Sequence, residues 1–365
     1  MKKNQIAALL FISALLTLTV SAQSQNKVGI AYRMFTDQSR NNWEGTAPRP
    51  IATTIWYPAD NDAQEKAVVI GDPANPLFLV GKASENARLS NAAKKYPLIL
   101  VSHGTGGAAL QMMWLGQYLA LNGFIVAAAS HHGNTGAEAK TAAQGFMLWW
   151  ERSKDLKVMV DKLLADAEFG PRIDQARIGA AGFSLGGATV ISVAGGIFDL
   201  NAFEKFCQSA ERDATCEPQP EFPEARKLFD KIKDTDPVVI KSLQQAGDSY
   251  RDKRIKAVFA IATALGGGFS PQSLASIQIP IHIVVGERDS TTPRLTNAQK
   301  FASSIKQSKL TVLPGKVGHY TFLAECSQTG KTLIPVCRDA DGVDRAKVHQ
   351  EVSEMALKFF QSNLR

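Results

Sequence analysis

Several features that would assign a chain to a particular class are scarce in this sequence of 365 residues. It has no block of consecutive Lys and Arg residues, and its formal net charge of +7 is spread along the chain, so its charge does not argue for nucleic-acid binding. It has no internal repeat, no low-complexity segment and no pair of cysteines at C-x2-C spacing. Hydrophobic residues make up 45% and charged residues 21%, which is not the composition of a disordered chain. We therefore expect one large globular domain without a metal site, and nothing in the sequence points to a cofactor.

Long apolar runs are scarce too, and the clearest one lies near the start of the chain. Residues 1–22 combine two lysines, an apolar run from Ile6 to Val20 and small residues at the end, which is the pattern of a cleaved signal peptide. The run is short for a bilayer span, so we expect no stable membrane anchor. No cysteine lies near the cleavage site, which argues against a lipoprotein. The mature chain, residues 23–365, would then carry a net charge of +5 and be secreted or periplasmic.

The four cysteines fall into two local pairs, Cys207 with Cys216 and Cys326 with Cys337. Exported proteins fold under oxidising conditions, so we predict two disulfides that each close a short loop. Four cysteines allow three connectivities, and a zinc site is the rival interpretation. The absence of C-x2-C spacing favours the disulfides.

From Tyr96 onward, predicted strands and helices alternate. Before that point, residues 27–33 and 51–57 are predicted to form an antiparallel pair, and residues 58–94 to form surface loops with one short strand near Val68. The alternation predicts right-handed crossovers around a mostly parallel central sheet flanked by helices, an α/β fold. The predicted strands are 96–101, 124–128, 176–181, 257–261, 281–285 and 310–313, and the predicted helices are 110–121, 149–167, 188–194, 295–305 and 345–360.

Residues 198–254 interrupt the alternation. They contain Phe-rich stretches at helical spacing that are separated by prolines, and they include Cys207 and Cys216. We predict a helical cap, or lid, inserted after the helix 188–194. The alternative is a helical excursion that packs on the edge of the sheet and never contacts a substrate.

The stretch Gly182-Phe183-Ser184-Leu185-Gly186-Gly187 matches G-x-S-x-G between a predicted strand and a helix of small residues. This is the context of a nucleophile elbow, in which a strained turn holds a serine hydroxyl clear of the sheet. The glycines leave room for the closely packed strand and helix, and the helix directs its N–H groups toward an anion formed there. We predict that Ser184 is a nucleophile, the alternative being an ordinary strand-to-helix turn.

A serine nucleophile needs a base and an acid, which on this type of sheet follow it in the order Asp or Glu, then His. Of the six histidines, three precede Ser184, His282 lies within a predicted strand and His349 lies on the last helix. His319, in the loop after the strand 310–313, is therefore the predicted base.

The acid is expected after an earlier strand of the same sheet. Asp289 lies in the loop that follows the strand 281–285, whereas the loop after 257–261 contains no carboxylate. Asp289 is the predicted acid and Glu287 is the alternative.

An oxyanion hole requires two backbone N–H groups directed at the same point. They are expected from the residue after the nucleophile, Leu185, and from the loop after the strand 96–101, where Thr105 is the natural donor and Gly106 the alternative. His103 is expected to support this loop by hydrogen bonding.

Other side chains are candidates for the wall of a substrate pocket. His131 and His132 follow the strand 124–128 at the same edge of the sheet, where they either shape the pocket or tie down the loop. Trp149 and Trp150 either line an apolar pocket or pack in the core.

Together these motifs resemble the α/β-hydrolase superfamily. More narrowly, the chain resembles exported proteins described as predicted dienelactone hydrolases, which are related to platelet-activating-factor acetylhydrolases. The resemblance runs from about residue 27 to the C-terminus, and the stretches that carry it are 53–58, 102–107, 131–135, 318–322 and 342–345.

The resemblance implies an α/β-hydrolase fold and places an oxyanion donor at Thr105. The chain departs from its relatives in two respects. The acetylhydrolases have their acid after the earlier strand, where this chain has none, and dienelactone hydrolases have a cysteine where this chain has Ser184. The resemblance therefore specifies fold and triad but not substrate.

We hypothesise a serine hydrolase that cleaves small-molecule carboxylic esters through an acyl-enzyme. The alternatives are a lactone- or amide-hydrolysing enzyme of the same fold, and a hydrolase-like binding protein without turnover. The sequence indicates neither the acyl and alcohol groups nor an oligomeric state.

Overall fold

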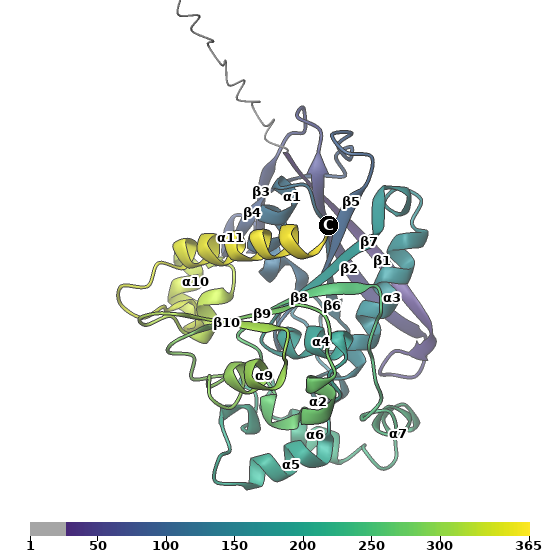
Figure 1. Ribbon diagram of the computed structural model, residues 1–365, viewed down its shortest axis with the longest axis vertical. Coiled ribbons are helices and arrows are strands. Elements are labelled where there is room, and N and C mark those ends of the chain that lie inside the picture. The colour runs from purple at the N-terminus through teal and green to yellow at the C-terminus, as the bar shows by residue number, and fades with distance from the viewer. Residues whose placement is uncertain (1–26) are drawn as a thin grey trace, which may run out of the picture.

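The computed structural model describes residues 27–365, so the predicted signal peptide, residues 1–22, lies outside the described residues (Figure 1). One sheet runs through the molecule, with its strands in the order β10-β9-β8-β7-β5-β6-β2-β1-β4-β11 and β3 paired to β4. The strands are β1 (Lys27–Asn41), β2 (Pro48–Ala59), β3 (Lys66–Asp72), β4 (Asn75–Glu85), β5 (Tyr96–Ser102), β6 (Ile125–His131), β7 (Ile173–Phe183), β8 (Ile255–Ile261), β9 (Ile281–Gly286), β10 (Ser308–Leu313) and β11 (Glu325–Cys326).

The six strands from β10 to β6 are parallel, whereas β2 joins β6 antiparallel and pairs with β1. The predicted antiparallel opening pair and mostly parallel sheet are therefore confirmed. Because the central strands run in one direction, β5, β7, β9 and β10 all end at the same edge of the sheet. Loops from this edge hold the candidate site.

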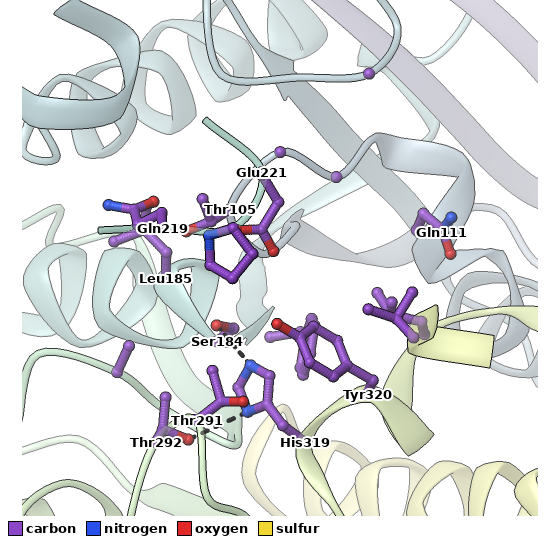
Figure 2. A pocket seen from close by; sticks show the side chains of 18 of the residues that line it. Thr105, Gln111, Ser184, Leu185, Gln219, Glu221, Thr291, Thr292, His319 and Tyr320 are labelled. Carbon is purple, nitrogen blue, oxygen red and sulfur yellow. Dashed lines mark hydrogen bonds between the residues drawn. The ribbon is translucent and has the colours of Figure 1, made fainter. Parts of the chain in front are cut away.

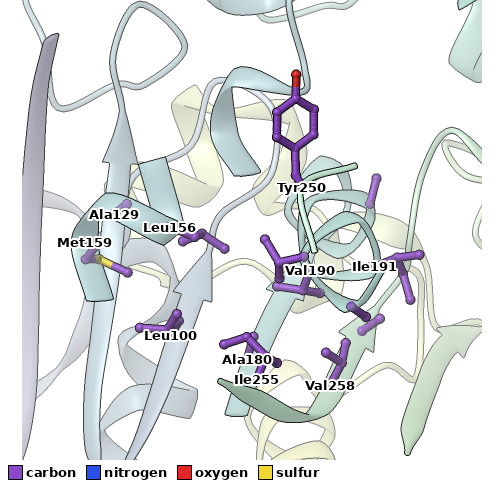
Figure 3. Close-up of a cluster of buried hydrophobic side chains, with 14 of the residues drawn as sticks. Leu100, Ala129, Leu156, Met159, Ala180, Val190, Ile191, Tyr250, Ile255 and Val258 are labelled. Atoms are coloured by element: carbon purple, nitrogen blue, oxygen red, sulfur yellow. The ribbon is translucent and has the colours of Figure 1, made fainter. Parts of the chain in front are cut away.

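Helices cover both faces of the sheet (Figure 1). The side chains of β5 show the division, because Leu98 and Leu100 join one buried cluster while Ile99 and Val101 join the other. The first cluster includes residues of α3, α4 and α9, and Figure 3 shows part of it around Leu100. The second includes residues of α1 and α11. The α-helices are α1 (Met113–Leu121), α2 (Ala143–Met147), α3 (Glu151–Ala165), α4 (Leu185–Ala194), α5 (Leu200–Gln208), α6 (Ala225–Asp230), α7 (Pro237–Leu243), α8 (Pro271–Ala275), α9 (Ala298–Ser304), α10 (Gln328–Leu333) and α11 (Arg345–Asn363).

The prediction for residues 58–94 is wrong in part, because they contain a hairpin of two strands, β3 and β4. Only scattered positions of this hairpin are buried, so the apolar periodicity of a half-buried strand is weak there. The hairpin also pairs with β11, which follows His319 in the chain. None of the helices in residues 27–365 combines the length and the apolar character that a membrane crossing would need.

Candidate active site

Ser184 occupies the sharp turn between β7 and α4, with φ 56° and ψ −120°. This left-handed backbone costs a non-glycine residue about 1–3 kcal/mol and persists only where its surroundings impose it. Here a Cβ on Gly182 would lie 2.1 Å from the Gly186 carbonyl oxygen, and one on Gly186 would lie 1.9 Å from that of Ser102. The Ser184 N–H also donates to the Ile261 carbonyl at 2.8 Å. The two glycines therefore allow the close packing that holds Ser184 in its strained turn.

His319 lies beside Ser184 (Figure 2), and Asp289 lies on the other side of the His319 ring. His319 Nε2 lies 2.9 Å from Ser184 Oγ, and His319 Nδ1 lies 2.8 Å from Asp289 Oδ2. All three residues are buried. The alternative acid, Glu287, is exposed, and its Oε2 accepts instead from the Gly315 N–H at 2.7 Å. The loops after β7, β9 and β10 thus supply one hydrogen-bonded chain of hydroxyl, imidazole and carboxylate.

Thr292 orients the carboxylate of Asp289. Its N–H donates to Oδ1 at 2.7 Å, and its hydroxyl lies 2.9 Å from Oδ2 and 3.1 Å from the Ala262 carbonyl. With both carboxylate oxygens acting as acceptors, the proton of neutral His319 lies on Nδ1. Nε2 is then left as an acceptor for the hydroxyl of Ser184.

Leu185 and Thr105 line the pocket beside Ser184 (Figure 2), and each has a backbone N–H group. Leu185 is the first residue of α4, and within residues 27–365 neither of these two N–H groups donates to a protein acceptor. The alternative donor, Gly106, is already engaged, because its N–H donates to Asn134 Oδ1 at 2.6 Å. The Leu185 and Thr105 amides are therefore available to an anion formed next to Ser184.

The orientation of the Thr105 N–H is set by the carbonyl of Gly104, which belongs to the same peptide plane. That carbonyl accepts from His103 Nδ1 at 2.6 Å and from Arg152 Nη2 at 3.3 Å, while Arg152 Nη1 donates to the His103 carbonyl at 2.6 Å. Burial and the Arg152 charge hold the pKa of His103 well below its ordinary value, so its ring is neutral. His103 supports the loop as predicted, and Arg152 is a second support that the sequence does not indicate.

Behind this loop lies a buried polar network centred on Asp155. Its carboxylate accepts from Arg49 Nε at 2.7 Å, from Arg40 Nη2 at 2.7 Å and from His131 Nδ1 at 3.0 Å. Burial alone would raise the pKa of Asp155, but the two guanidinium groups hold it well below its ordinary value. His131 Nε2 also lies 2.9 Å from Ser102 Oγ, which completes a second Ser-His-Asp arrangement. Ser102 has no exposed surface, so this arrangement is structural.

A pocket of about 580 Å³ opens over Ser184 and His319. Thr105 and Leu185 also line it, as does the predicted pocket residue Trp149. Its remaining walls come from widely separated segments, namely 70, 78, 106–108, 111, 136, 183, 214–215, 217–221, 264–265, 291–292, 320, 323 and 334–336.

Three residues predicted for the pocket wall do not line it. His131 belongs to the network beneath the loop, and His132 lies 2.9 Å from Glu138 Oε1 through Nδ1. Trp150 is buried and donates through Nε1 to Ser242 Oγ at 2.9 Å. The two histidines thus hold loops in place, because the Nδ1 atom of each is hydrogen-bonded to a neighbouring carboxylate. Trp150 packs in the core.

Both predicted disulfides are confirmed, between Cys207 and Cys216 and between Cys326 and Cys337. Such bonds persist in oxidising compartments, so they are consistent with an extracellular protein. Within residues 27–365, no three or more His, Cys, Asp or Glu side chains are grouped as metal ligands would be.

Comparisons with known proteins agree with the predicted fold and resemblance. Residues 79–146 match the family model described as platelet-activating factor acetylhydrolase, isoform II, a span that includes Thr105 but not Ser184. No curated protein sequence matches the chain significantly. Among solved structures, a ferulic acid esterase from Streptomyces cinnamoneus matches with a TM-score of 0.62 and 18% identity, over 95% of this chain and 92% of that one. The chain has the fold of this esterase and resembles the acetylhydrolases in the segment around the Thr105 loop.

Proposed function

We propose that the chain is a serine carboxylic ester hydrolase that acts on small-molecule esters through an acyl-enzyme. The observation that carries the proposal is the hydrogen-bonded chain Ser184, His319, Asp289, which faces a pocket beside two unengaged amides. The matches to an acetylhydrolase family model and to an esterase fold support the same class.

In the proposed mechanism, Ser184 Oγ attacks the ester carbonyl while His319 Nε2 takes its proton. Asp289 keeps the imidazole in the required tautomer and stabilises the imidazolium ion that forms. The carbonyl oxygen becomes negative and accepts hydrogen bonds from the N–H groups of Leu185 and Thr105. His319 then protonates the departing alcohol. In the second half of the reaction it removes a proton from a water molecule that attacks the acyl-enzyme, and it returns this proton to Ser184 Oγ as the acid leaves.

The segment 198–254 is proposed as a cap over this site. It contains α5, α6 and α7, and its residues 214–215 and 217–221 contribute to the pocket wall. We further propose that the chain is secreted or periplasmic, as the predicted signal peptide at residues 1–22 indicates and the two disulfides support.

A fluorophosphonate probe and an ester series test the proposed function. The protein comprising residues 23–365 is expected to take up one probe molecule, which peptide mass spectrometry should locate on Ser184. It should also hydrolyse p-nitrophenyl esters between acetate and decanoate, with an optimum set by the size of the pocket. A folded protein that neither reacts with the probe nor hydrolyses any ester would contradict the proposal and favour a binding protein. Labelling by the fluorophosphonate without turnover would instead mean that the substrate of the enzyme is not represented in the ester series.

Replacing Arg152 tests the support of the oxyanion hole. Arg152→Met removes the cation that fixes the Gly104 carbonyl, so the Thr105 N–H should no longer be held in the orientation that points to the oxyanion. Loss of a whole oxyanion donor costs about 10²–10³ in kcat, and we expect the loss of its support to cost about tenfold to 10², with KM little changed. Arg152→Lys, which retains the charge, should recover part of the rate. Steady-state kinetics on folded variants would measure this, and a loss confined to KM would contradict it.

A further inference from the structure

One segment of the proposed cap forms a continuous strip of the pocket wall. It is the sequence Glu217-Pro218-Gln219-Pro220-Glu221, here called the strap, and all five of its residues line the pocket. The strap lies across the pocket from His319 and Tyr320 (Figure 2). A substrate bound at Ser184 would therefore lie between the strap and the triad.

The strap is fixed at both ends. It begins directly after Cys216, which is bonded to Cys207, and Asp213 nearby accepts from Asn297 Nδ2 at 2.8 Å and from the Thr296 hydroxyl. At its other end Phe222 packs edge-on against Phe146, with 5.2 Å between ring centroids. The two prolines also restrict the backbone. The strap therefore presents its side chains in a defined arrangement.

The strap offers hydrogen-bond acceptors and few donors. Its two prolines have no N–H, and Gln219 Oε1 is buried without a hydrogen-bond partner. Glu217 is neutralised by Arg212, whose Nη2 lies 2.5 Å from Glu217 Oε1. Glu221 forms no ion pair with any Lys, Arg or His among residues 27–365, and no Lys or Arg of this range lines the pocket. Among the described residues that line the pocket, Glu221 is thus the acidic side chain without an ion-pair partner, in a chain whose net charge is positive.

Glu221 lies next to the reacting centre. A Cβ on Gly106 would be 2.8 Å from Cβ and Cγ of Glu221, so the side chain packs directly on the loop that carries Thr105. The walls of the pocket partly desolvate its carboxyl group and raise the pKa of Glu221, while His319 opposes that shift. Facing it, Tyr320 has a pKa raised by burial and by the Glu221 charge. A negative group beside an oxyanion hole disfavours anionic ligands unless a cation compensates it.

We propose that Glu221 selects the substrate: the enzyme prefers esters that carry a cationic ammonium group over neutral esters of the same shape, and it rejects esters that carry a carboxylate. The ammonium group would bind the Glu221 carboxylate and the electron-rich face of Tyr320. The inference rests on the proposed function for turnover, but the binding of a cation by the pocket does not require it.

Matched esters test this selection. Acetylcholine and 3,3-dimethylbutyl acetate have the same shape and differ in a charge on the alcohol. The p-nitrophenyl esters of 4-(trimethylammonio)butanoate and 5,5-dimethylhexanoate differ in the same way on the acyl group. In at least one pair, the ratio of kcat/KM for the cationic over the neutral ester should be about tenfold, as a single desolvated charge contact allows. The pair that responds identifies which side of the ester lies along the strap. The p-nitrophenyl monoester of glutaric acid should be a poorer substrate than either neutral ester.

Glu221→Gln should reduce the cation-to-neutral ratio to near one and improve the relative rate of the glutaric monoester. Glu224→Gln is the matched control, because it removes the same charge from the same segment, whereas Glu224 does not line the pocket and pairs with Lys227. It should leave the ratio unchanged.

Saturation-transfer NMR with tetramethylammonium provides a readout without turnover, and binding should be lost in Glu221→Gln only. Equal ratios in wild type and Glu221→Gln, or tetramethylammonium binding that survives Glu221→Gln, would overturn the inference. Cation binding by a folded protein that neither reacts with the fluorophosphonate nor hydrolyses any ester would overturn the proposed function alone.

Discussion

Replacing Ser184 by alanine is expected to lower kcat/KM for the best p-nitrophenyl ester by about 10⁴-fold or more, to the residual rate that the oxyanion hole and binding supply. Ser184 Oγ is the atom that contacts His319 Nε2, and the strained turn presents no other hydroxyl at that point. Fluorophosphonate labelling should be lost together with turnover. Initial-rate kinetics and intact-protein mass spectrometry measure the two effects independently.

Ser102 provides a matched control for this prediction. It also forms a Ser-His-Asp arrangement, with His131 and Asp155, but it has no exposed surface. Ser102→Ala should therefore keep the ability to react with the fluorophosphonate, even if the loop it supports becomes less well ordered. Turnover above about a hundredth of wild type in Ser184→Ala would contradict the assignment of the nucleophile, since a triad serine contributes far more than that.

The centre of the candidate site can be predicted because each of its residues is marked by a local pattern or by chain order. Ser184 lies in a turn that requires glycines, because a Cβ on Gly182 or Gly186 would lie 2.1 Å or 1.9 Å from a backbone carbonyl oxygen. The motif and the packing therefore describe the same constraint. Asp289 and His319 follow parallel strands, and the carboxyl ends of parallel strands lie at one edge of a sheet. The fold is predictable for the same reason, since continuous apolar strands alternate with helices.

The supports of the site cannot be predicted, because they depend on long-range contacts between polar groups. Arg152 and Asp155 belong to α3, and a charged residue on a helix is ordinarily exposed to solvent. Here both are buried and find their partners on distant segments, such as Gly104 and Arg49. The sequence places His131 near the site correctly, but its role depends on Asp155, which nothing in the sequence connects to it. The strands β4 and β11 escape prediction because they are defined by pairing with each other across a long stretch of sequence, and neither is a continuous buried apolar run.

Replacing Asp289 by asparagine should reduce kcat by about 10³–10⁴-fold while KM changes little, the magnitude seen when a triad carboxylate becomes an amide. The Thr292 N–H donates to Oδ1, so the amide oxygen of the new side chain should occupy that position. The amide NH2 would then face His319 Nδ1 and force the ring proton onto Nε2. An imidazole with a protonated Nε2 cannot take the proton of Ser184. Steady-state kinetics with a fixed ester would measure the loss, and slow fluorophosphonate labelling should remain.

Two further variants separate the tautomer argument from a general loss of structure. Thr292→Val removes the hydroxyl but keeps the carboxylate and the N–H that orients it, so kcat should fall by about tenfold or less, the scale of one neutral hydrogen bond. Glu287→Gln changes the neighbouring carboxylate in the same loop, which contacts the Gly315 N–H and not His319. It should retain nearly full activity. If Glu287→Gln instead showed the large loss and Asp289→Asn the small one, the acid would be Glu287, and the loop after β9 would have to rearrange before the reaction. The 2.8 Å contact between Asp289 Oδ2 and His319 Nδ1 favours the large loss in Asp289→Asn, because this contact already satisfies the geometry that the base requires.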